Sequence, residues 1–539
     1  MRYLLHDVLE NSVKQFGDKV SIKEELGKTI TYIELNNLSN KFAHAFSKLK
    51  SCIIKNPYIG ILSAVHINSI AAVLGCLKIG CAYVPLDESS PEERLKHIVQ
   101  NLNLDLLVID PVFYERYKGL LNDSSLKYIV LVDAWNKEVF VESSKIIYFD
   151  SVIFESEDNP KDLNQVSDDL AYILHSSGST GIPKGIMLTH RNARTFVDWM
   201  QKEFYLTDQD IIISRAPFKF DLSIFDVFNA LKVGATLVCY NWNHKREIPQ
   251  RHRDYVCLME REKVTVLYTT PSTFITLMNE GGLENANLKL TRIMYAGESF
   301  HVAQLRRLKK MLPDTKIANI YGPTETNIIT YYWVSEIPED MTSIPLGKVV
   351  DDTEIMVVSE DLSRICAVNE VGELWCRGGT VTSGYIGLED KTKECLVKSP
   401  FHTYPSYFWR TGDYGFKDHE NILHYRGRKD HMVKIKGHRV EIGEIEAAIS
   451  GLGAFNEFAV VSTMQGGLEN KLFCFFCSYS GFNKNVSSYV EFLRVKLPHY
   501  MIPSQFIELE ILPKTSSGKI DRNRLAEEAR RFKEELQNA

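Results

Sequence analysis

Short apolar runs alternate along the chain with longer amphipathic stretches. Runs rich in β-branched and aromatic residues at 58–62, 106–109 and 128–132 predict strands, and amphipathic segments at 31–50 and 92–102 predict helices. Thr31 and Glu34 have capping-box spacing, which indicates a helix start at that point. This alternation is typical of βαβ units with mostly parallel sheets, so the sequence predicts an α/β fold.

The pattern changes after Lys436. Helices are expected at 440–449 and 486–497 and apolar strands around 458–461 and 472–478, which together predict a small α+β domain. Cys474 and Cys477 form the chain's one CxxC pattern, but they lie inside an apolar run, so we expect a buried strand and not a redox pair. Residues 522–539 are rich in charge at helical spacing, and we expect a solvated end helix.

Composition places the chain among ordinary globular proteins. Its 539 residues include 63 basic and 69 acidic side chains, for a net charge of −6, with 44% apolar residues. These values exclude disorder and collagen-like structure and give no reason to expect a nucleic-acid partner. Asp7 and Glu10 interrupt any secretory apolar segment, and no run is long enough to span a bilayer, so we expect a cytoplasmic protein without a membrane partner. Ten scattered Cys residues argue against a zinc module or a disulfide framework.

A loop rich in Ser, Gly and Thr at 175–185 is the first candidate for chemistry. It lies between two apolar runs, 170–174 and 186–188, and it combines hydroxyls, glycines and one Lys, which can cradle a polyphosphate. Its members are Ser176, Ser177, Gly178, Ser179, Thr180, Gly181 and Lys184. The loop is not a Walker A sequence, and the chain's only Gly-Lys-Thr, at 27–29, lacks the upstream glycine of that motif.

Several longer motifs follow in order: Asn-Ile-Tyr-Gly-Pro-Thr-Glu-Thr at 319–326, Trp-Arg-Thr-Gly-Asp-Tyr-Gly at 409–415, a Gly-Arg-Lys-Asp segment at 427–430, and Pro-Lys-Thr-Ser-Ser-Gly-Lys at 513–519. With the Ser/Gly/Thr loop, they resemble the adenylate-forming superfamily, and within it the amino-acid adenylation domains of nonribosomal peptide synthesis. The resemblance implies a large N-terminal domain of αβ-layered subdomains, residues 1–429, and a small C-terminal lid, residues 430–539. Asp430 matches the family's hinge.

The resemblance also implies a reaction in two halves. A carboxylate attacks the α-phosphate of ATP to give an acyl-adenylate and pyrophosphate, and a phosphopantetheine thiol then takes the acyl group and releases AMP. Lys519 matches the catalytic lysine, Thr324 a donor to the α-phosphate and Glu325 the Mg²⁺ ligand. Lys434 matches the lysine that faces the site after lid rotation. The expected nucleotide contacts are the 176–184 loop residues named above together with Gly297, Glu298, Asn319, Tyr321, Asp413 and Arg428, where Tyr321 stacks on adenine and Asp413 accepts from the ribose hydroxyls.

Asp221 matches the family's anchor for the substrate α-amine. A buried carboxylate requires a cationic partner, which an amino acid supplies and a simple acid does not. The remaining wall positions by resemblance are Leu222, Phe225, Tyr268, Met294, Ala296, Ile320, Ile328 and Ile329, with Thr269 as the alternative to Tyr268. These residues resemble those of prolyl-carrier-protein ligases. They favour L-proline, with a small aliphatic amino acid such as alanine or valine as the alternative.

The partner expected from the resemblance is a separate phosphopantetheinylated carrier protein. The chain stops 20 residues after Lys519 and holds no Gly-Gly-x-Ser attachment motif. The competing interpretations are a coenzyme A ligase or a luciferase-like enzyme of the same superfamily, against which Asp221 argues, and a non-catalytic nucleotide sensor, against which Lys184, Glu325 and Lys519 argue. A D-alanine-carrier ligase is a further alternative, but that family has a cysteine where this chain has Ala296.

Overall fold

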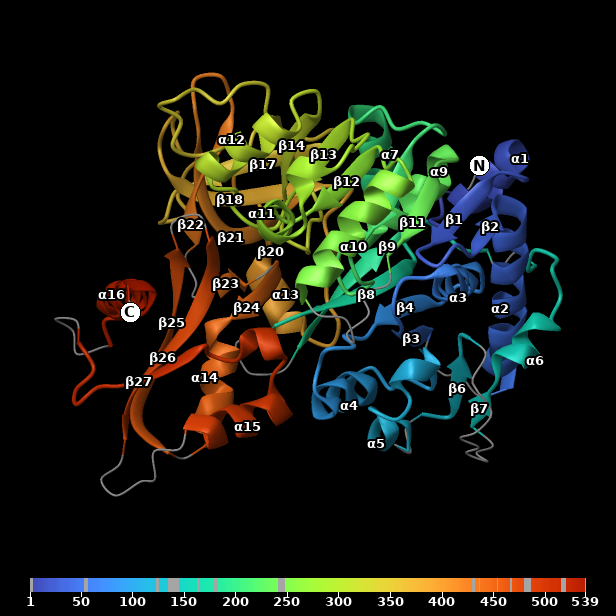
Figure 1. Cartoon of the computed structure of the whole chain (residues 1–539), viewed down its shortest axis with the longest axis horizontal. Coiled ribbons are helices and arrows are strands. Elements are labelled where there is room, and N and C mark those ends of the chain that lie inside the picture. Colours follow the sequence, from blue (N-terminus) through green and yellow to red (C-terminus); the bar gives the residue numbers. More distant parts are fainter. Residues whose placement is uncertain are drawn as a thin grey trace.

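The computed structural model describes residues 3–52, 57–122, 126–133, 145–161, 164–177, 183–240, 248–428, 432–435, 437–452, 454–465, 468–478, 486–514 and 520–538. A large part carries three sheets, and a smaller C-terminal part, here called the lid, runs from residue 432 to 538 (Figure 1). The α/β class predicted from the sequence is confirmed. The predicted hinge Asp430 lies outside the described residues, so the 429/430 boundary stays a prediction. No helix among the described residues is both long and apolar enough to cross a membrane.

The first large sheet has the strand order β16-β15-β14-β13-β12-β10-β11-β1-β2. Its six inner strands run parallel, and β2, β15 and β16 are antiparallel at the two edges. The strands are β1 (Val20–Glu24), β2 (Thr29–Thr31), β10 (Ile211–Ser214), β11 (Thr236–Cys239), β12 (Val266–Thr269), β13 (Arg292–Tyr295), β14 (Lys316–Tyr321), β15 (Thr330–Trp333) and β16 (Lys348–Val349). The carboxyl ends of β10, β12, β13 and β14 therefore lie at one edge of the sheet.

The second large sheet has the order β19-β9-β8-β4-β3-β5-β6-β7. Strands β3 to β8 are parallel, and β9 forms an antiparallel hairpin with β8. The strands are β3 (Tyr58–Leu62), β4 (Ala82–Pro85), β5 (Leu106–Ile109), β6 (Tyr128–Leu131), β7 (Ile146–Ile147), β8 (Leu170–Ser176), β9 (Lys184–Thr189) and β19 (Gly384–Tyr385). The strands predicted at 58–62, 106–109 and 128–132 are thus confirmed, the last ending one residue early.

Three helical layers cover these two sheets. The middle layer packs between them and contains α1 (Asp7–Phe16), α2 (Tyr32–Cys52), α3 (Ile67–Lys78), α7 (His190–Glu203), α9 (Ala230–Val233) and the π-helix η2 (Phe225–Asn229). The outer layers contain α10 (Ile248–Arg261), α11 (Pro271–Glu280) and α12 (Val302–Met311) on one side and α4 (Glu92–Asn101) and α5 (Lys118–Leu121) on the other. Short elements complete the large part: η1 (Pro111–Phe113), α6 (Phe149–Ile153), α8 (Leu222–Ile224) and η3 (Leu283–Asn285).

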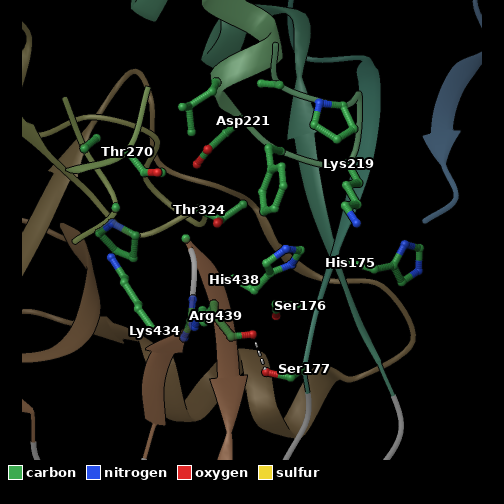
Figure 2. Close-up of a pocket in the computed structure, with 18 of the residues that line it drawn as sticks. His175, Ser176, Ser177, Lys219, Asp221, Thr270, Thr324, Lys434, His438 and Arg439 are labelled. Atoms are coloured by element: carbon green, nitrogen blue, oxygen red, sulfur yellow. Dashed lines mark hydrogen bonds between the residues drawn. The ribbon is translucent and has the colours of Figure 1, made fainter. Parts of the chain in front are cut away.

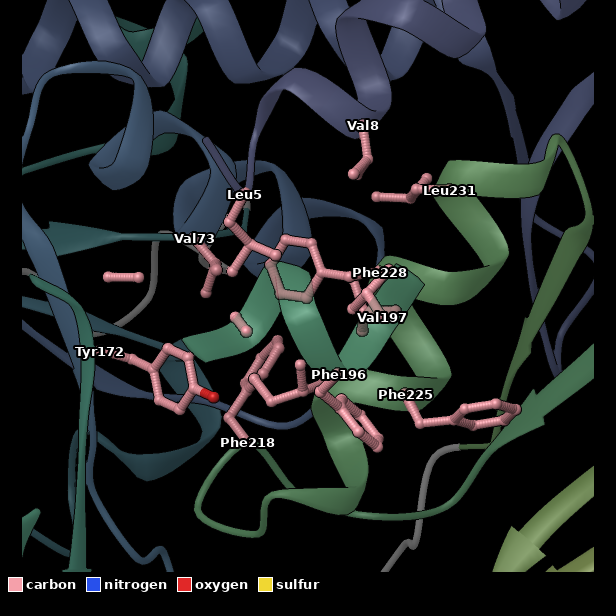
Figure 3. Close-up of a cluster of buried hydrophobic side chains, with 14 of the residues drawn as sticks. Leu5, Val8, Val73, Tyr172, Phe196, Val197, Phe218, Phe225, Phe228 and Leu231 are labelled. Carbon is pink, nitrogen blue, oxygen red and sulfur yellow. The ribbon is translucent and has the colours of Figure 1, made fainter. Parts of the chain in front are cut away.

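Successive strand residues face different layers. Ile212 packs in the middle layer and Ile213 in the outer one, as the two-residue period of a strand requires. The middle layer is the largest cluster of buried side chains, and Figure 3 shows Phe196 of α7, Phe225 and Phe228 of η2 and Val73 of α3 meeting there. The predicted capping box forms at the start of α2, where the Thr31 amide donates to Glu34 at 2.8 Å and the Glu34 amide donates to the Thr31 hydroxyl at 3.3 Å.

A third, antiparallel sheet completes the large part. Its order is β17-β18-β21-β20, with β22 paired to the other portion of β21. The elements are β17 (Thr353–Val358), β18 (Gly372–Gly378), α13 (Glu389–Cys395), β20 (Leu396–Lys398), β21 (Tyr407–Lys417) and β22 (Leu423–Arg428). Asp413 of β21 stands opposite Arg428 of β22 in the register, so the two strands bring a carboxylate and a guanidinium together.

The lid contains a hairpin of β23 (Met432–Ile435) and β24 (His438–Glu441), a sheet of β25 (Phe455–Gln465), β26 (Leu468–Ser478) and β27 (Gln505–Glu508), and the helices α14 (Ile442–Ser450), α15 (Val486–Lys496), η4 (His499–Met501) and α16 (Arg522–Asn538). Cys474 and Cys477 lie on β26 in two different buried clusters, which confirms a strand. Two expectations need correction. The helix expected from 440 begins at Ile442 because β24 pairs with β23, and α16 is not fully solvated because Leu525 and Ala529 are buried beside the lid sheet.

Helices α2 and α3 approach closely at Gly75. A Cβ atom at Gly75 would lie 2.7 Å from Phe42 Cβ and 3.0 Å from the Ala43 amide nitrogen of α2. Real Cβ atoms do not make such contacts with a helix backbone, and the surrounding core is close-packed. The absence of a side chain at this position therefore sets the spacing of the two helices.

We predict that Gly75→Ala destabilises the protein by about 1–2 kcal/mol, because overpacking outweighs the gain of about 1 kcal/mol in helix propensity. Urea unfolding followed by circular dichroism measures the change. Gly119→Ala is the matched control, since its Cβ would meet only the mobile carboxyl end of Glu92. Equal or greater stability of Gly75→Ala relative to wild type would contradict the packing argument.

Candidate active site

A pocket opens where the carboxyl ends of the parallel strands meet the lid. Residues that directly follow β10, β12, β13 and β14 line it, as expected for ligand sites of open α/β sheets. Figure 2 shows Asp221 and Thr324 entering from the large part and Lys434, His438 and Arg439 entering from the lid. The pocket is therefore built from both parts of the molecule.

The predicted substrate residues lie on the large-part side of this pocket. Asp221 stands just before the short helix α8, and burial raises the pKa of its carboxyl to about 6 although Lys434 opposes the shift. Four of the predicted wall residues line the pocket: Leu222, Tyr268, Ala296 and Ile328. Thr269, the alternative to Tyr268, lines it as well. The others lie in the apolar core behind it: Phe225, Met294, Ile320 and Ile329. Tyr268 and Thr269 both reach the pocket, so the two register alternatives remain open.

The wall of this half is apolar and rigid. Phe225 and Tyr268 meet edge to face, with ring centroids 5.4 Å apart, and the π-helix that carries Phe225 begins directly after α8. Edge-to-face packing of two large rings restricts both side chains. This geometry favours a small apolar ligand group beside the Asp221 carboxylate.

The predicted nucleotide residues gather around Asp413. Its carboxylate accepts a hydrogen bond of 2.5 Å from the Tyr321 hydroxyl and lies 3.0 Å from the Arg428 guanidinium. Burial, together with the Asp413 charge, raises the pKa of Tyr321 well above its usual range. Asp413, Arg428 and Gly297 line the pocket. Asn319 does not line it, and its amide donates at 2.7 Å to the Pro345 carbonyl, which is a structural contact.

Glu325 is buried deep beside the pocket. Its carboxylate pairs with the Arg439 guanidinium of β24 and accepts a hydrogen bond of 2.6 Å from the Tyr385 hydroxyl. Burial alone would raise the pKa of Glu325, but Arg439 and this hydrogen bond hold it below its usual value. A carboxylate oxygen is the donor that Mg²⁺ prefers, so Glu325 fits the predicted metal role only when Arg439 is displaced. Among the described residues no group of three or more His, Cys, Asp or Glu side chains could hold a metal ion.

The predicted phosphate loop joins β8 to β9, as the apolar runs on either side of it predicted. Gly178, Ser179, Thr180 and Gly181 lie outside the described residues. At the two ends of the loop, Ser177 and Lys184 contact β24 of the lid. The Ser177 hydroxyl donates to the Arg439 carbonyl at 2.9 Å (Figure 2). It also accepts from the Glu441 amide at 2.9 Å, and Lys184 pairs with Glu441 at 2.5 Å. Ser176 lines the pocket nearby.

Of the two predicted lid lysines, Lys434 lies in this pocket. Burial lowers the pKa of its ammonium, while the carboxylates of Asp413 and Asp221 oppose that shift. Lys519 lies outside the described residues. The lid arrangement therefore corresponds to the one that the resemblance associates with the second half-reaction.

Several side chains hold the lid against the large part: Glu298, which was expected to contact the nucleotide, and Arg439 and Glu441, which sequence reasoning missed. Glu298 accepts hydrogen bonds from the Ser272 amide at 3.0 Å and from the Gly437 amide of the lid at 2.5 Å. Arg439 and Glu441 belong to the same motif segment as Lys434, but no role was assigned to them. The signal for Arg439 in the sequence was its positive charge. The predicted metal ligand Glu325 is distant in the chain, and only the fold brings the two side chains into contact.

A second group of missed residues lies at the outer side of the pocket. Asp87 pairs with Lys219 at 2.5 Å and lies 3.4 Å from the Tyr500 hydroxyl of the lid. Burial opposes ionisation of Asp87, yet Lys219 holds its pKa below the usual range. The His438 ring stacks on Tyr500 with 3.5 Å between centroids and contacts Phe220. The contacts of Tyr500 with Asp87 and of His438 with Phe220 also join the lid to the large part.

Comparison with known proteins places the chain in a family. The profile described as "AMP-binding enzyme" matches residues 9–386. The chain is 31% identical to tyrocidine synthase 3 of Brevibacillus parabrevis over 97% of its length but spans only 8% of that protein. It is 30% identical to the L-proline--[L-prolyl-carrier protein] ligase of Pseudomonas fluorescens, covering 97% of this chain and 99% of the ligase.

The fold agrees with a solved structure as well. The Vibrio cholerae adenylation domain AlmE, solved in complex with glycyl-adenosine-5'-phosphate, superposes with a TM-score of 0.82 at 20% identity over 98% of both chains. That likeness supports the large N-terminal and small C-terminal arrangement. The profile matches most of the chain, and the Pseudomonas fluorescens ligase matches it end to end. The chain therefore belongs to the AMP-binding enzyme family.

Proposed function

We propose that this protein is an AMP-forming ligase that activates a small amino acid with ATP and passes it to the phosphopantetheine thiol of a carrier protein. The observation that carries the proposal is the Asp221 carboxylate beside the apolar wall of a pocket that also holds Asp413, Arg428 and Thr324. A pocket with a buried anion beside apolar walls suits an ammonium group next to a small apolar side chain. The prolyl-carrier ligase named above, similar over its full length, supports the same reaction class.

In the first half-reaction, a carboxylate oxygen of the amino acid bonds to the α-phosphorus of ATP, and the bond between the α-phosphorus and its bridging oxygen to the β-phosphate breaks. The products are aminoacyl-AMP and pyrophosphate. Because both reacting groups are anionic, cationic side chains and hydrogen-bond donors must reduce their repulsion. We assign this work to Lys519 and Thr324, with Asp413 and Tyr321 orienting the nucleoside. Mg²⁺ held by Glu325 would neutralise phosphate charge.

In the second half-reaction, the thiol sulfur bonds to the carbonyl carbon of the aminoacyl-AMP. The bond from that carbon to the bridging anhydride oxygen breaks, AMP leaves with its electron pair, and the thiol proton passes to solvent. We assign compensation of the AMP phosphate charge in this step to Lys434, which lines the pocket, and the first step to Lys519. Two lysines of one lid cannot occupy the same place at once, so lid rotation gives each half-reaction its own cation.

L-proline is the substrate that we propose. Its side chain is small and apolar, and its secondary ammonium can still pair with Asp221. The walls formed by Leu222, Ala296 and Ile328 offer no charged or amide group to a larger polar side chain. A small aliphatic amino acid such as alanine or valine is the alternative that the same walls accept.

Amino-acid-dependent ATP–pyrophosphate exchange tests the function. Wild type should exchange with proline, and Asp221→Ala should lose at least about 100-fold in kcat/KM, since removing one partner of a buried charge pair costs about 3–5 kcal/mol. Asp361→Ala, which removes an exposed carboxylate of a hairpin remote from the pocket, is the matched control and should exchange normally. Exchange with a non-amino acid only would overturn the proposal in favour of a coenzyme A ligase.

The affinity for the amino acid should depend on the ionisation of Asp221. Only the carboxylate form pairs with an ammonium, and burial raises its pKa to about 6. Below that value the dissociation constant should increase by about tenfold per pH unit, and above it the constant should be flat. Equilibrium binding of proline between pH 5 and 8 measures this profile. The Asp221→Asn variant should bind weakly without an inflection, and an inflection that persists in it would assign the titration to another group.

The two lysines should separate the half-reactions. Lys519→Ala should lose at least about 100-fold in pyrophosphate exchange, because it removes a cation from the phosphoryl-transfer step. Lys434→Ala should leave exchange close to wild type and slow thioester formation on the carrier, which a single-turnover assay with preformed aminoacyl-AMP measures. Equal loss of both activities in both variants would contradict separate roles.

A further inference from the structure

Two ion pairs join β24 of the lid to residues that the proposed function assigns to Mg²⁺ and to the phosphates of ATP. Arg439 pairs with Glu325, and Glu441 pairs with Lys184. All four side chains are largely buried, with exposed side-chain fractions of 16% for Arg439, 1% for Glu325, 15% for Glu441 and 10% for Lys184. In each pair the lid supplies the charge that a ligand would otherwise supply: a cation opposite Glu325 and an anion opposite Lys184.

The backbone of β24 fixes these two side chains in place. The Ser177 hydroxyl bonds both the Arg439 carbonyl and the Glu441 amide, and the Gly437 amide donates to Glu298. In a strand, residues two apart point to the same face, so Arg439 and Glu441 reach the large part side by side. The same hairpin carries Lys434 into the pocket. Docking of β24 and placement of Lys434 are therefore one event.

We propose, on the basis of the proposed function, that Arg439 and Glu441 are positioning residues that exchange places with Mg²⁺ and pyrophosphate. While pyrophosphate and its metal ion occupy the site, Glu325 and Lys184 are engaged and β24 cannot dock. Once both have left, the two buried charges need partners, and Arg439 and Glu441 provide them. Thiol transfer then follows pyrophosphate release because Lys434 reaches the pocket only with β24 docked.

The electrostatic argument supports competition and not simultaneous binding. Glu325 already has the Arg439 guanidinium and the Tyr385 hydroxyl as partners, and a second cation at the same carboxylate would meet the Arg439 charge at close range. A phosphate oxygen at Lys184 would likewise meet the Glu441 carboxylate. For a ligand that binds only the undocked form, the apparent dissociation constant equals the intrinsic constant divided by the fraction of molecules that are undocked.

The first experiment measures binding of magnesium pyrophosphate to the full chain by calorimetry. Arg439→Gln and Glu441→Gln should each bind it at least about tenfold more tightly than wild type, as expected when a docked form populated at about 90% is released. Without Mg²⁺, pyrophosphate alone should also bind more tightly to both variants than to wild type, because β24 docks as one unit and the loss of either ion pair frees Lys184 for a phosphate. Arg364→Gln, which breaks the exposed pair of Arg364 with Glu370, is the matched control and should bind as wild type. Unchanged or weaker binding by both lid variants would overturn the inference.

A second measurement needs no variant and so does not depend on their folding. Hydrogen–deuterium exchange of wild type should show the Gly437 and Glu441 amides, bonded to Glu298 and Ser177, exchanging at least about tenfold faster when Mg²⁺ and pyrophosphate are added together. Unchanged or slower exchange would overturn the inference. Absence of amino-acid-dependent pyrophosphate exchange in wild type would overturn the proposed function, and the inference that rests on it. Normal pyrophosphate exchange by wild type, together with unchanged binding of magnesium pyrophosphate by Arg439→Gln and Glu441→Gln, would overturn the inference alone.

Discussion

Three carboxylates lie in or beside one pocket of this molecule, and basic side chains from both parts of the structure compensate them. Asp221, Glu325 and Asp413 all lie in or beside the pocket, and a carboxylate removed from water is stable only with a cation or several hydrogen bonds nearby. Asp413 finds its partner within the large part, in Arg428 of the neighbouring strand. Glu325 finds its cation in the lid, and Asp221 has Lys434 as its main compensating charge. The position of the lid is therefore tied to the charge balance of the pocket.

This dependence gives each half-reaction of the proposed function a different set of partners. In the proposed adenylation step, ATP and Mg²⁺ would bring phosphate charge and a metal cation into the site, so Glu325 and Lys184 would be matched without the lid hairpin. In the structure, the hairpin β23–β24 matches the same two side chains with Arg439 and Glu441. In this proposal, reactants and protein side chains alternate as counter-ions. A rotation about one hinge is sufficient for this change because the two lid residues are two apart on a single strand.

The sequence predicted much of the fold because its signals were local. Three such signals are confirmed: the capping box of Thr31 and Glu34, the alternation of β3, α4 and β5, and the apolar run of β26. Each is determined by a few neighbouring residues. The short hairpin strand β24 was missed because its four residues are mixed polar and apolar, and the strand is stabilised by pairing with β23 and by contacts with Ser177. The burial of one face of α16 was missed for a related reason. Leu525 and Ala529, which are buried against the lid sheet, stand among many charged residues in this segment.

The candidate site shows the same division between local and distant information. Motif resemblance placed Asp221, Thr324 and Asp413 in one pocket, because such motifs occur where strand ends converge. It gave no indication that Arg439 would meet Glu325, 114 residues away in the chain, or that Tyr500 would reach Asp87 across 413 residues. Such contacts depend on where a separate unit docks, which no local pattern specifies. We propose that the residues that resemblance identifies act on the substrates. Among the residues that it leaves out, Arg439, Glu441 and Tyr500 contact the other part of the protein. In an enzyme whose lid must occupy more than one position, the second group determines when each of the first can act.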